Sequence, residues 1–403
     1  MSVNTLNFEQ VSTVLTSIVN QATNQTVLTP TDTSSFVSVA QVALRADRDS
    51  VMNAISNILA RTIFSIRAYS AKMTGLDMDT FRWGAMMRKL SIADTDWEDD
   101  EAYDYPIFYD ANQNPADGEG LSIDRWKIKK PNVLQTNFYG QSVYADHMTI
   151  TEDQLETAFT GPEQLGSFLS LLMTNLSNRL EMSNEALRRG LVCNAIGALY
   201  EENDSDRVIH LLTEYKTLTG NTSWTVNDIY DPANFPAFCK WAYSRVAEIT
   251  DLFTANSTMF QTNITGKPIL RHTPYEFQRV YLYSPFQRQM EARVLADTYH
   301  DNYLKYADVE TIPYWQSIST RDTVKVTPAY VDNTGALVTS TAQTVENVFG
   351  LIFDRDAMGM SILDRRVLST PLNESGLYRN IWVHGKQRIV FDNTEKLALL
   401  LLD

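Results

Sequence analysis

The spacing of hydrophobic residues predicts one helix of unusual length over residues 160–202. Thr160, Pro162 and Glu163 mark its start. A threonine cap and a following glutamate can accept hydrogen bonds from the unpaired amides of the first turn, and a proline there already has a helical φ and no amide to satisfy. No further proline occurs before Pro232, so about 40 residues can continue helically, over roughly 60 Å. Its apolar positions fall into two sets: Leu165, Leu169, Leu172, Leu176 and Leu180, and then Leu187, Leu191, Ala195 and Leu199. The four-residue steps of the second set rotate the apolar seam by roughly 90°, so we expect the helix to change packing partners along its length.

Residues 1–92 carry two further helical patterns. The first comprises Phe8, Val11, Leu15 and Ile18, and the second lies between residues 52 and 66. A break at residues 29–32 separates them, and no glycine occurs before Gly75. This part is therefore expected to be an arm of helices joined by an extended link.

The charge of the chain changes abruptly after residue 93. Residues 94–119 contain ten acidic residues and neither lysine nor arginine, and basic residues return directly afterwards. Strand-like segments at 103–109 and 126–128 surround a turn-rich stretch at 112–120, which predicts a long hairpin with residues 137–151 as its return path. The charged residues of its two flanks are Glu98, Asp99, Asp100, Glu101, Arg125, Lys127, Lys129 and Lys130.

Two interpretations of this charged segment are open. It is either a solvated surface loop whose charge supports solubility, or a projecting hairpin whose flanks meet complementary patches on a neighbouring copy of the chain.

After the long helix the pattern mixes helices with strands. A helix is predicted from about residue 235 to 255, with an aromatic stripe that we interpret as core packing. A strand at 279–283 is followed by a helix that begins at Ser284 and Pro285. Beyond Asp322 alternating and β-branched residues predict a sheet, which ends in a buried strand at residues 397–402. The fold class is therefore α+β.

Composition narrows the possible functions. The 403 residues carry a net charge of −15, so the chain as a whole should be repelled by nucleic acid, and a general DNA-binding protein is not expected. Cys193 and Cys239 are the only cysteines and the N-terminus does not resemble a signal peptide, which favours a reducing compartment. The longest apolar run, at 397–402, is far below the ~18 residues typical of a membrane span.

No catalytic constellation is found in the sequence. The five histidines do not lie at metal-binding spacings, and phosphate loops, hydrolase elbows and paired cysteines are absent, so neither a metal nor a cofactor is expected. Asp354 and Asp356 follow an apolar strand and are predicted to cap a turn rather than bind metal. Arg365–Arg366 and Arg271–His272 are interpreted as salt-bridge or subunit contacts.

The order of these parts resembles the major capsid proteins of tailed bacteriophages with the HK-ninety-seven fold. The resemblance is carried by this order and by three segments: Thr258–Lys267 with Arg271–Pro274, Val348–Ala357, and Asn393–Leu402. It implies an N-terminal arm at 1–92, an extended E-loop hairpin at 93–150 and a P-domain at 151–254, whose spine helix is residues 160–202. It also implies an A-domain at 255–370 and C-terminal strands at 371–403 that return to the sheets of both domains.

The resemblance further implies a function. One chain would assemble into the hexamers and pentamers of an icosahedral shell that encloses double-stranded DNA in the virion, assembled in the host cytoplasm. A separate scaffolding protein, a portal and in some cases a decoration protein would be its partners, with no membrane involved. Some family members crosslink a hairpin lysine to an asparagine of a neighbour, and Lys127, Lys129 and Lys130 lie in the corresponding segment.

Two alternatives remain at this point. An encapsulin-like compartment would share the fold but would lack nucleic acid and would hold a cargo peptide. An enzyme with an unrecognised site would use His272, His300 and Asp354, and would be distinguished by turnover of a small substrate.

Overall fold

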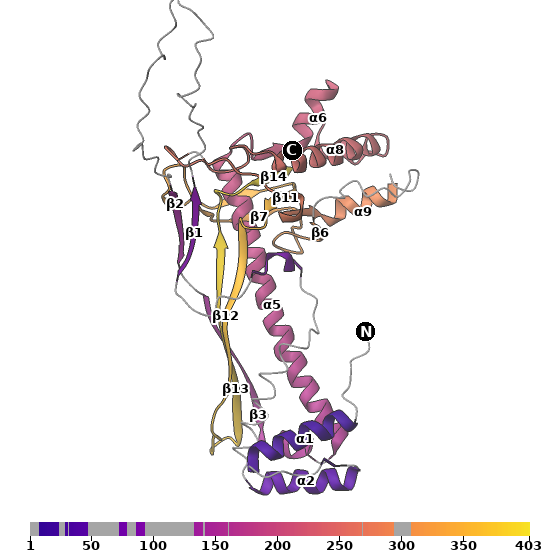
Figure 1. The fold of residues 1–403 in the computed structure, drawn as a ribbon. Helices are drawn as coiled ribbons and strands as arrows, with labels where there is room; N and C mark the ends of the chain where they lie inside the picture. Colours follow the sequence, from indigo (N-terminus) through magenta and orange to yellow (C-terminus); the bar gives the residue numbers. More distant parts are fainter. Residues whose placement is uncertain are drawn as a thin grey trace, which may run out of the picture.

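The computed structural model describes residues 8–23, 29–30, 32–46, 72–78, 86–92, 133–139, 142–159, 161–267, 269–293 and 308–403. Its central element is helix α5, Pro162–Glu202, of 41 residues. A mixed body of helices and sheets surrounds one end of α5, and helices α1 and α2 lie at the other (Figure 1). The predicted long helix is therefore confirmed.

The start of α5 differs in detail from the prediction. The N-cap is Gly161, which offers no side-chain hydrogen bond, and Pro162 occupies the first helical turn. Thr160, the expected cap, lies outside the described residues. At the other end Asn203 adopts a left-handed conformation (φ 46°), and its amide donates to Leu199 O at 3.0 Å, which terminates the helix.

Helix α5 changes partners along its length, as predicted. In its first half Leu176 and Leu180 pack against Val383 of a three-stranded sheet. In its second half the helix is buried on several sides, with Val192 and Ile196 in a core formed with a five-stranded sheet. One rigid helix thus joins two separate cores.

The five-stranded sheet has the order β4-β14-β11-β5-β6. Strand β14 (Leu397–Leu401) pairs in parallel with β4 (Val208–His210) and antiparallel with β11 (Val348–Asp354). On the other side of β11 lie β5 (Gln278–Tyr283) and then β6 (Asp308–Ile312). Every residue of β14 is buried, since α5 covers one face of the sheet and α8 (Phe235–Thr254) the other, so the predicted terminal strand is confirmed as a core strand.

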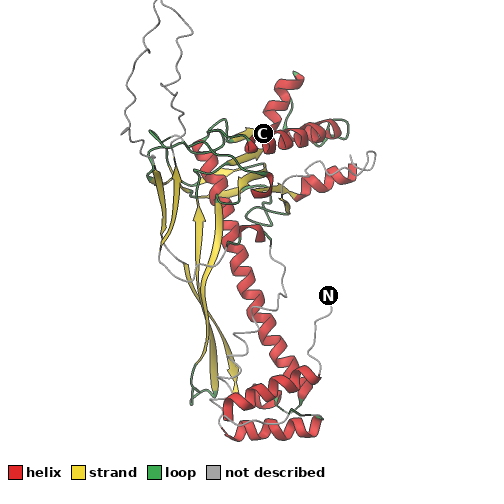
Figure 2. Ribbon diagram, viewed as in Figure 1, coloured by secondary structure: helices red, strands yellow, loops and turns green. Residues whose placement is uncertain are grey.

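The second sheet is long, three-stranded and antiparallel, in the order β12-β13-β3 (Figure 2). Its strands are β12 (Met358–Ser369), β13 (Tyr378–Phe391) and β3 (Ser142–Thr151). The sheet expected beyond Asp322 is present, but β12 carries only a weak strand signal, because Asp364, Arg365 and Arg366 interrupt its apolar pattern next to a bulge between Ile362 and Asp364.

The remaining elements are short or peripheral. Strand β1 (Met86–Ile92) pairs with β2 (Val133–Tyr139), β7 (Val324–Val326) with β10 (Gln343–Val345), and β8 (Ala329–Val331) with β9 (Leu337–Thr339). The other helices are α1 (Phe8–Thr23), α2 (Thr33–Ala46), η1 (Thr74–Leu76), α4 (Glu152–Ala158), α6 (Leu211–Thr219), α7 (Val226–Ile229), η2 (Tyr275–Phe277) and α9 (Ser284–Arg293). The predicted helices at 235–255 and after Ser284 are confirmed.

The N-terminal arm contains a helix that the sequence did not predict. Helix α1 agrees with the first helical pattern, but α2 follows the break at residues 29–32 where an extended link was expected. Asp32 and Ser35 close a capping box, in which Ser35 N donates to Asp32 Oδ1 at 2.7 Å and Asp32 N donates to Ser35 Oγ at 3.2 Å. The second predicted arm helix, at 52–66, lies outside the described residues.

Candidate functional site

A two-stranded stem projects at the edge of the body. Strands β1 and β2 pair antiparallel from Met86↔Tyr139 to Ile92↔Val133, so the two ends of segment 93–132 meet. The eight charged residues singled out in the sequence all belong to this segment, which lies outside the described residues. The stem (β1 and β2) is the described part of the predicted hairpin, and it begins at Met86, before position 93. Residues 137–151 were expected to be the return path, but the return strand is β2, Val133–Tyr139, because β3 (Ser142–Thr151) pairs with β13 in the three-stranded sheet.

The side chains of the stem are distributed unusually. Leu90 is 63% exposed, Ile92 62% and Val133 43%, whereas Lys89 and Ser91 turn inward and are half-buried. A half-buried strand normally places apolar residues inside and charged residues outside. Over residues 89–92 this order is inverted, since Leu90 and Ile92 face outward and Lys89 faces the body, where it makes a specific polar contact.

That contact is an ion cluster of four residues: Lys89, Arg271, Asp392 and Glu395. Lys89 Nζ donates to Asp392 Oδ2 at 2.5 Å and also to Glu395. Arg271 pairs with the same Glu395 oxygen and reaches Ser91 Oγ of β1 at 3.3 Å. Burial raises the pKa of the Glu395 carboxyl, although Lys89 and Arg271 both act to lower it. The cluster is the polar anchor of the stem.

Both acids of the cluster belong to the turn 392–396 that joins β13 to β14. Asp392, Asn393, Thr394, Glu395 and Lys396 are all buried, and Asp392 is only 1% exposed. Five consecutive buried polar residues require a partner for each side chain. Asp392 Oδ1 accepts from Thr394 N at 3.0 Å and Thr394 Oγ1 at 2.6 Å, which fixes the turn internally.

Asn393 joins the turn to the end of α5. Its Nδ2 donates to Val331 O at 2.7 Å, Thr262 Oγ1 at 2.9 Å and Glu202 Oε1 at 3.1 Å. Glu202 is ion-paired with the buried Arg207. Burial raises the pKa of Glu202 and lowers that of Arg207, and in each case the partner opposes the shift.

Lys396 joins the turn to the end of α8. Its ammonium group donates to Ala255 O at 2.7 Å, and to Phe253 O and Ser257 Oγ at 3.2 Å, so it satisfies carbonyls at a helix C-terminus. Burial lowers the pKa of Lys396 to about 8, against the raising effect of Asp354. The turn 392–396 thus connects the stem, α5 and α8.

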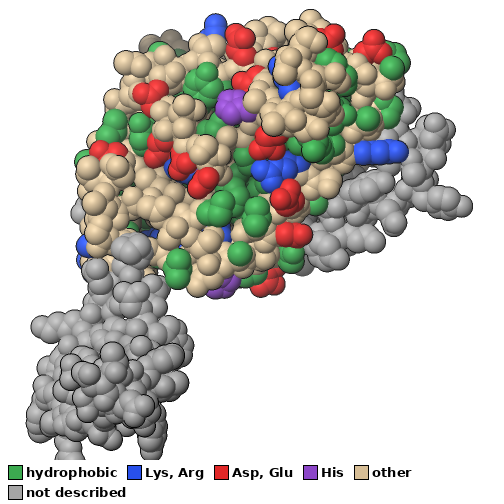
Figure 3. All heavy atoms as spheres, turned by 90° about the horizontal axis from the view of Figure 1, so that it is seen from above, with side chains coloured by type: hydrophobic (Ala, Val, Ile, Leu, Met, Phe, Trp, Pro, Cys, Tyr) green, Lys and Arg blue, Asp and Glu red, His purple; other side chains and the backbone are tan. Residues whose placement is uncertain are grey.

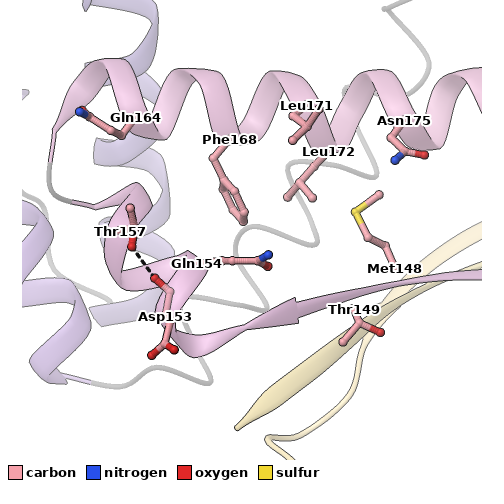
Figure 4. Close-up of a pocket in the computed structure, with 10 residues that line it drawn as sticks. All are labelled: Met148, Thr149, Asp153, Gln154, Thr157, Gln164, Phe168, Leu171, Leu172 and Asn175. Atoms are coloured by element: carbon pink, nitrogen blue, oxygen red, sulfur yellow. Dashed lines mark hydrogen bonds between the residues drawn. The ribbon is translucent and has the colours of Figure 1, made fainter. Parts of the chain in front are cut away.

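Two hollows flank these elements. A groove of about 990 Å³ separates β2 from α5 and is lined by apolar side chains that include Leu134, Phe138, Leu187, Tyr330 and Leu337. A pocket of about 730 Å³ lies at the start of α5, where Phe168 and Leu172 extend toward Gln154 and Met148 (Figure 4). Asp153 is the only ionisable residue among the ten that line this pocket, so it offers no acid–base pair.

Known proteins share both the sequence pattern and the fold. A family model described as "Phi29-like phage major capsid protein" matches residues 15–400. The chain belongs to this family. No curated protein matches the sequence.

Solved phage capsids support the family membership at the level of fold. The capsid of Staphylococcus phage Andhra is 12% identical over 85% of this chain and 86% of that one, with a TM-score of 0.52. A structure described as the head fiber and inner core protein gp22 of native bacteriophage P68 is 11% identical over 84% and 87%, with a TM-score of 0.49. The similarity to the Andhra capsid, whose TM-score exceeds 0.5, confirms the predicted α+β, HK-ninety-seven-like fold class.

As a member of a phage major capsid family, the protein is a structural component of the virion that associates with its own copies. The encapsulin-like alternative is not favoured. No helix among the described residues is long and apolar enough to cross a membrane.

The residues suspected in an enzyme do not form a site in the described part of the capsid protein. Asp354 accepts from Thr273 Oγ1 at 2.6 Å and from Asp356 N at 2.8 Å, so the predicted turn cap is confirmed. His272 is exposed, and His300 lies outside the described residues. In the parts of the chain with assigned positions, His, Cys, Asp and Glu do not gather into a metal-binding group. Seen from above, acidic, basic and apolar side chains are interspersed over the capsid protein (Figure 3).

Sequence reasoning missed the anchor. Arg271 was interpreted as a salt-bridge or subunit contact, and its pairing with Glu395 confirms the salt bridge. Lys89, Asp392 and Glu395 were not singled out, although a run of five polar residues directly before six apolar ones, 397–402, is a usable signal for a buried polar turn.

Proposed function

We propose that this capsid protein builds a closed icosahedral shell of hexamers and pentamers around double-stranded DNA, and that the hairpin of each copy grips a neighbour. The observation that carries the proposal is the stem, whose two strands flank segment 93–132 and whose outer face carries exposed apolar residues. Leu90, Ile92 and Val133 form a contiguous patch in the β1–β2 register. Contiguous exposed apolar side chains on a soluble protein mark contact surfaces.

The charges of the hairpin support a contact with a second copy. Its acidic flank contains Glu98, Asp99, Asp100 and Glu101, and its basic flank contains Arg125, Lys127, Lys129 and Lys130. Repeated subunits that present both signs can pair in one register and reject others, because like charges brought together cost free energy. Shells built from one chain need such self-complementary contacts.

The division of the chain follows from the same proposal. Residues 1–92 are the N-terminal arm, 93–150 the E-loop hairpin, 151–254 the P-domain, 255–370 the A-domain and 371–403 the returning strands. A scaffolding protein, a portal and a decoration protein would act as separate partners during assembly in the host cytoplasm, without a membrane. The net charge of −15 would keep packaged DNA from adhering to the shell. The role is structural, without catalysis or a cofactor.

The test uses the full chain, expressed alone and with a scaffolding protein, and negative-stain microscopy of the products. Reversing the acidic flank with Glu98→Lys, Asp99→Lys, Asp100→Lys and Glu101→Lys should abolish closed shells. Reversing the basic flank in addition, with Arg125→Glu, Lys127→Glu, Lys129→Glu and Lys130→Glu, should restore them.

The control reverses two exposed acids of the body, Glu346→Lys and Glu374→Lys, which lie far from the hairpin in the sequence. It changes the net charge by half as much as the acidic-flank variant does. This control should still form shells. If the acidic-flank variant forms shells as well as the unmodified chain does, the hairpin does not grip its neighbour through these charges. A chain that remains monomeric under every condition would contradict the proposal as a whole.

A further inference from the structure

We infer that Lys89 is the positioning residue of the hairpin: its ion pairs with Asp392 and Glu395 fix the orientation on the body of the stem, β1 and β2, whose strands flank segment 93–132. The inference rests on the proposed function, in which that segment contacts a neighbouring copy.

The ion cluster is neutral and enclosed. Lys89 and Arg271 supply two positive charges, Asp392 and Glu395 supply two negative charges, and each acid is buried. Charge-assisted hydrogen bonds between such groups are short and directional, so they fix a geometry more sharply than apolar contacts do. A strand held through them keeps one orientation.

The body side of the cluster is fixed in place. Besides its internal hydrogen bonds with Thr394, Asp392 donates from its backbone N to Ala357 O at 2.7 Å. Lys396, next to Glu395, is held by the end of α8, and Asn393 by the end of α5. Because Lys89 contacts this turn, the position of the stem is fixed relative to both α5 and α8.

The apolar side chains Leu134 and Phe138 of β2 line the groove toward α5. The groove of about 990 Å³ lies between β2 and α5, and the outer face of the stem is exposed. Among the described residues, Lys89 and Ser91 are the stem side chains that hydrogen-bond to the body. The ion cluster is therefore the polar contact that fixes the stem beside the groove.

The neighbouring residue Arg88 provides a matched control. It lies on the same strand, is exposed, and points away from the turn. Lys89→Met should accelerate amide exchange in segments 86–92 and 133–139 of the unassembled full chain by about tenfold or more, and should sharply reduce the yield of closed shells. Arg88→Met should change neither. If Lys89→Met leaves stem exchange and shell yield at wild-type values, the inference is wrong.

A second variant separates positioning from general stability. Lys89→Met leaves two buried acids facing one cation and should lower the Tm of the body. Lys89→Met combined with Glu395→Gln removes one charge of each sign, so the Tm should return toward the wild-type value while rapid stem exchange and low shell yield persist. If the shell yield of this double variant recovered together with its Tm, Lys89 would act only through the stability of the body, and the inference would be wrong.

The two proposals fail in different ways. Shells that depend on the hairpin charges but not on Lys89 would refute only the positioning role. Shells that are indifferent to the hairpin charges would refute the proposed grip itself.

Discussion

Arg188 on α5 donates from Nε and Nη2 to the two carboxylate oxygens of Asp77, at 2.9 and 2.8 Å. The pair ties residues 72–78, which contain η1, across the middle of the long helix. The same segment is held by Met73 N donating to Glu310 Oε1 at 2.7 Å, and by Met78 N donating to Met360 O at 2.9 Å. It therefore clamps α5 to strands of both large sheets.

The first prediction concerns this pair. Arg188→Leu should lower the free energy of unfolding by about 1–3 kcal/mol, because a bidentate bond is lost while the Asp77 carboxylate, 42% exposed, can still be hydrated. Arg179→Leu on the same helix breaks an exposed pair with Asp146 and should cost less than about 1 kcal/mol. Urea unfolding of the unassembled chain measures both, and equal losses would contradict this ranking.

The second prediction compares two glycines of α5. A Cβ added at Gly197 would lie 2.4 Å from Val326 Cγ1 of β7, whereas one added at Gly190 would meet nothing within 4 Å. Gly190→Ala should stabilise the protein by about 0.5–1 kcal/mol through helix propensity. Gly197→Ala should destabilise it by about 1–3 kcal/mol through overpacking, and Val326→Ala in the same chain should recover part of the loss. If Gly197→Ala stabilised the protein instead, Val326 and β7 would have to move away from the added methyl group without cost, and this prediction would be wrong.

The third prediction concerns Asn393. Asn393→Ala should lower the free energy of unfolding by about 2–4 kcal/mol, because Glu202, Thr262 and Val331 lose a shared partner. Asn393→Asp should cost more at pH 8, since it places a second carboxylate beside Glu202, and its extra cost should shrink toward pH 5 as one acid of the pair becomes protonated. Denaturant unfolding at the two pH values checks this. If Asn393→Asp and Asn393→Ala behaved alike at both, the network would not be coupled as described.

The fourth prediction concerns the pH dependence that Lys396 introduces. Its pKa is about 8 in the folded chain, below the ordinary 10.5, so between these values the folded protein binds fewer protons than the unfolded chain. The free energy of unfolding should therefore rise with pH across this window, by on the order of 3 kcal/mol. Lys396→Met should remove this rise, and the difference between the two pH profiles isolates Lys396 from other groups. Parallel profiles would refute the depressed pKa.

Much of the fold could be predicted because its elements carry strong local signals. Helix α5 has periodic leucines and a proline at its start, and β14 is an unbroken apolar run. The misses have physical causes. Strand β12 carries Asp364, Arg365 and Arg366 within its pairing, and α2 is rich in Ser, Thr and Val, which are weak helix formers stabilised here by packing and by a capping box.

The anchor was harder to predict, because its members are far apart in the sequence. Lys89 and Asp392 are separated by 303 positions, and local pattern cannot pair them. What the sequence does offer is the alternation Lys89, Leu90, Ser91 and Ile92 in β1, in which the two apolar residues face outward and the two polar ones face the body. Such a break in the expected pattern is a signal for function rather than for core packing.

The position of β14 between β4 and β11 has a consequence for synthesis. A ribosome must pass residue 401 before β14 can insert between β4 and β11 as an interior strand of the five-stranded sheet, and must pass residue 395 before Lys89 can pair with Asp392 and Glu395. Until then the sheet lacks the strand between β4 and β11, and the stem lacks its ion pairs with the turn 392–396. The five-stranded sheet and the ion cluster that holds the stem are therefore both completed only after β14 and the turn before it have been made.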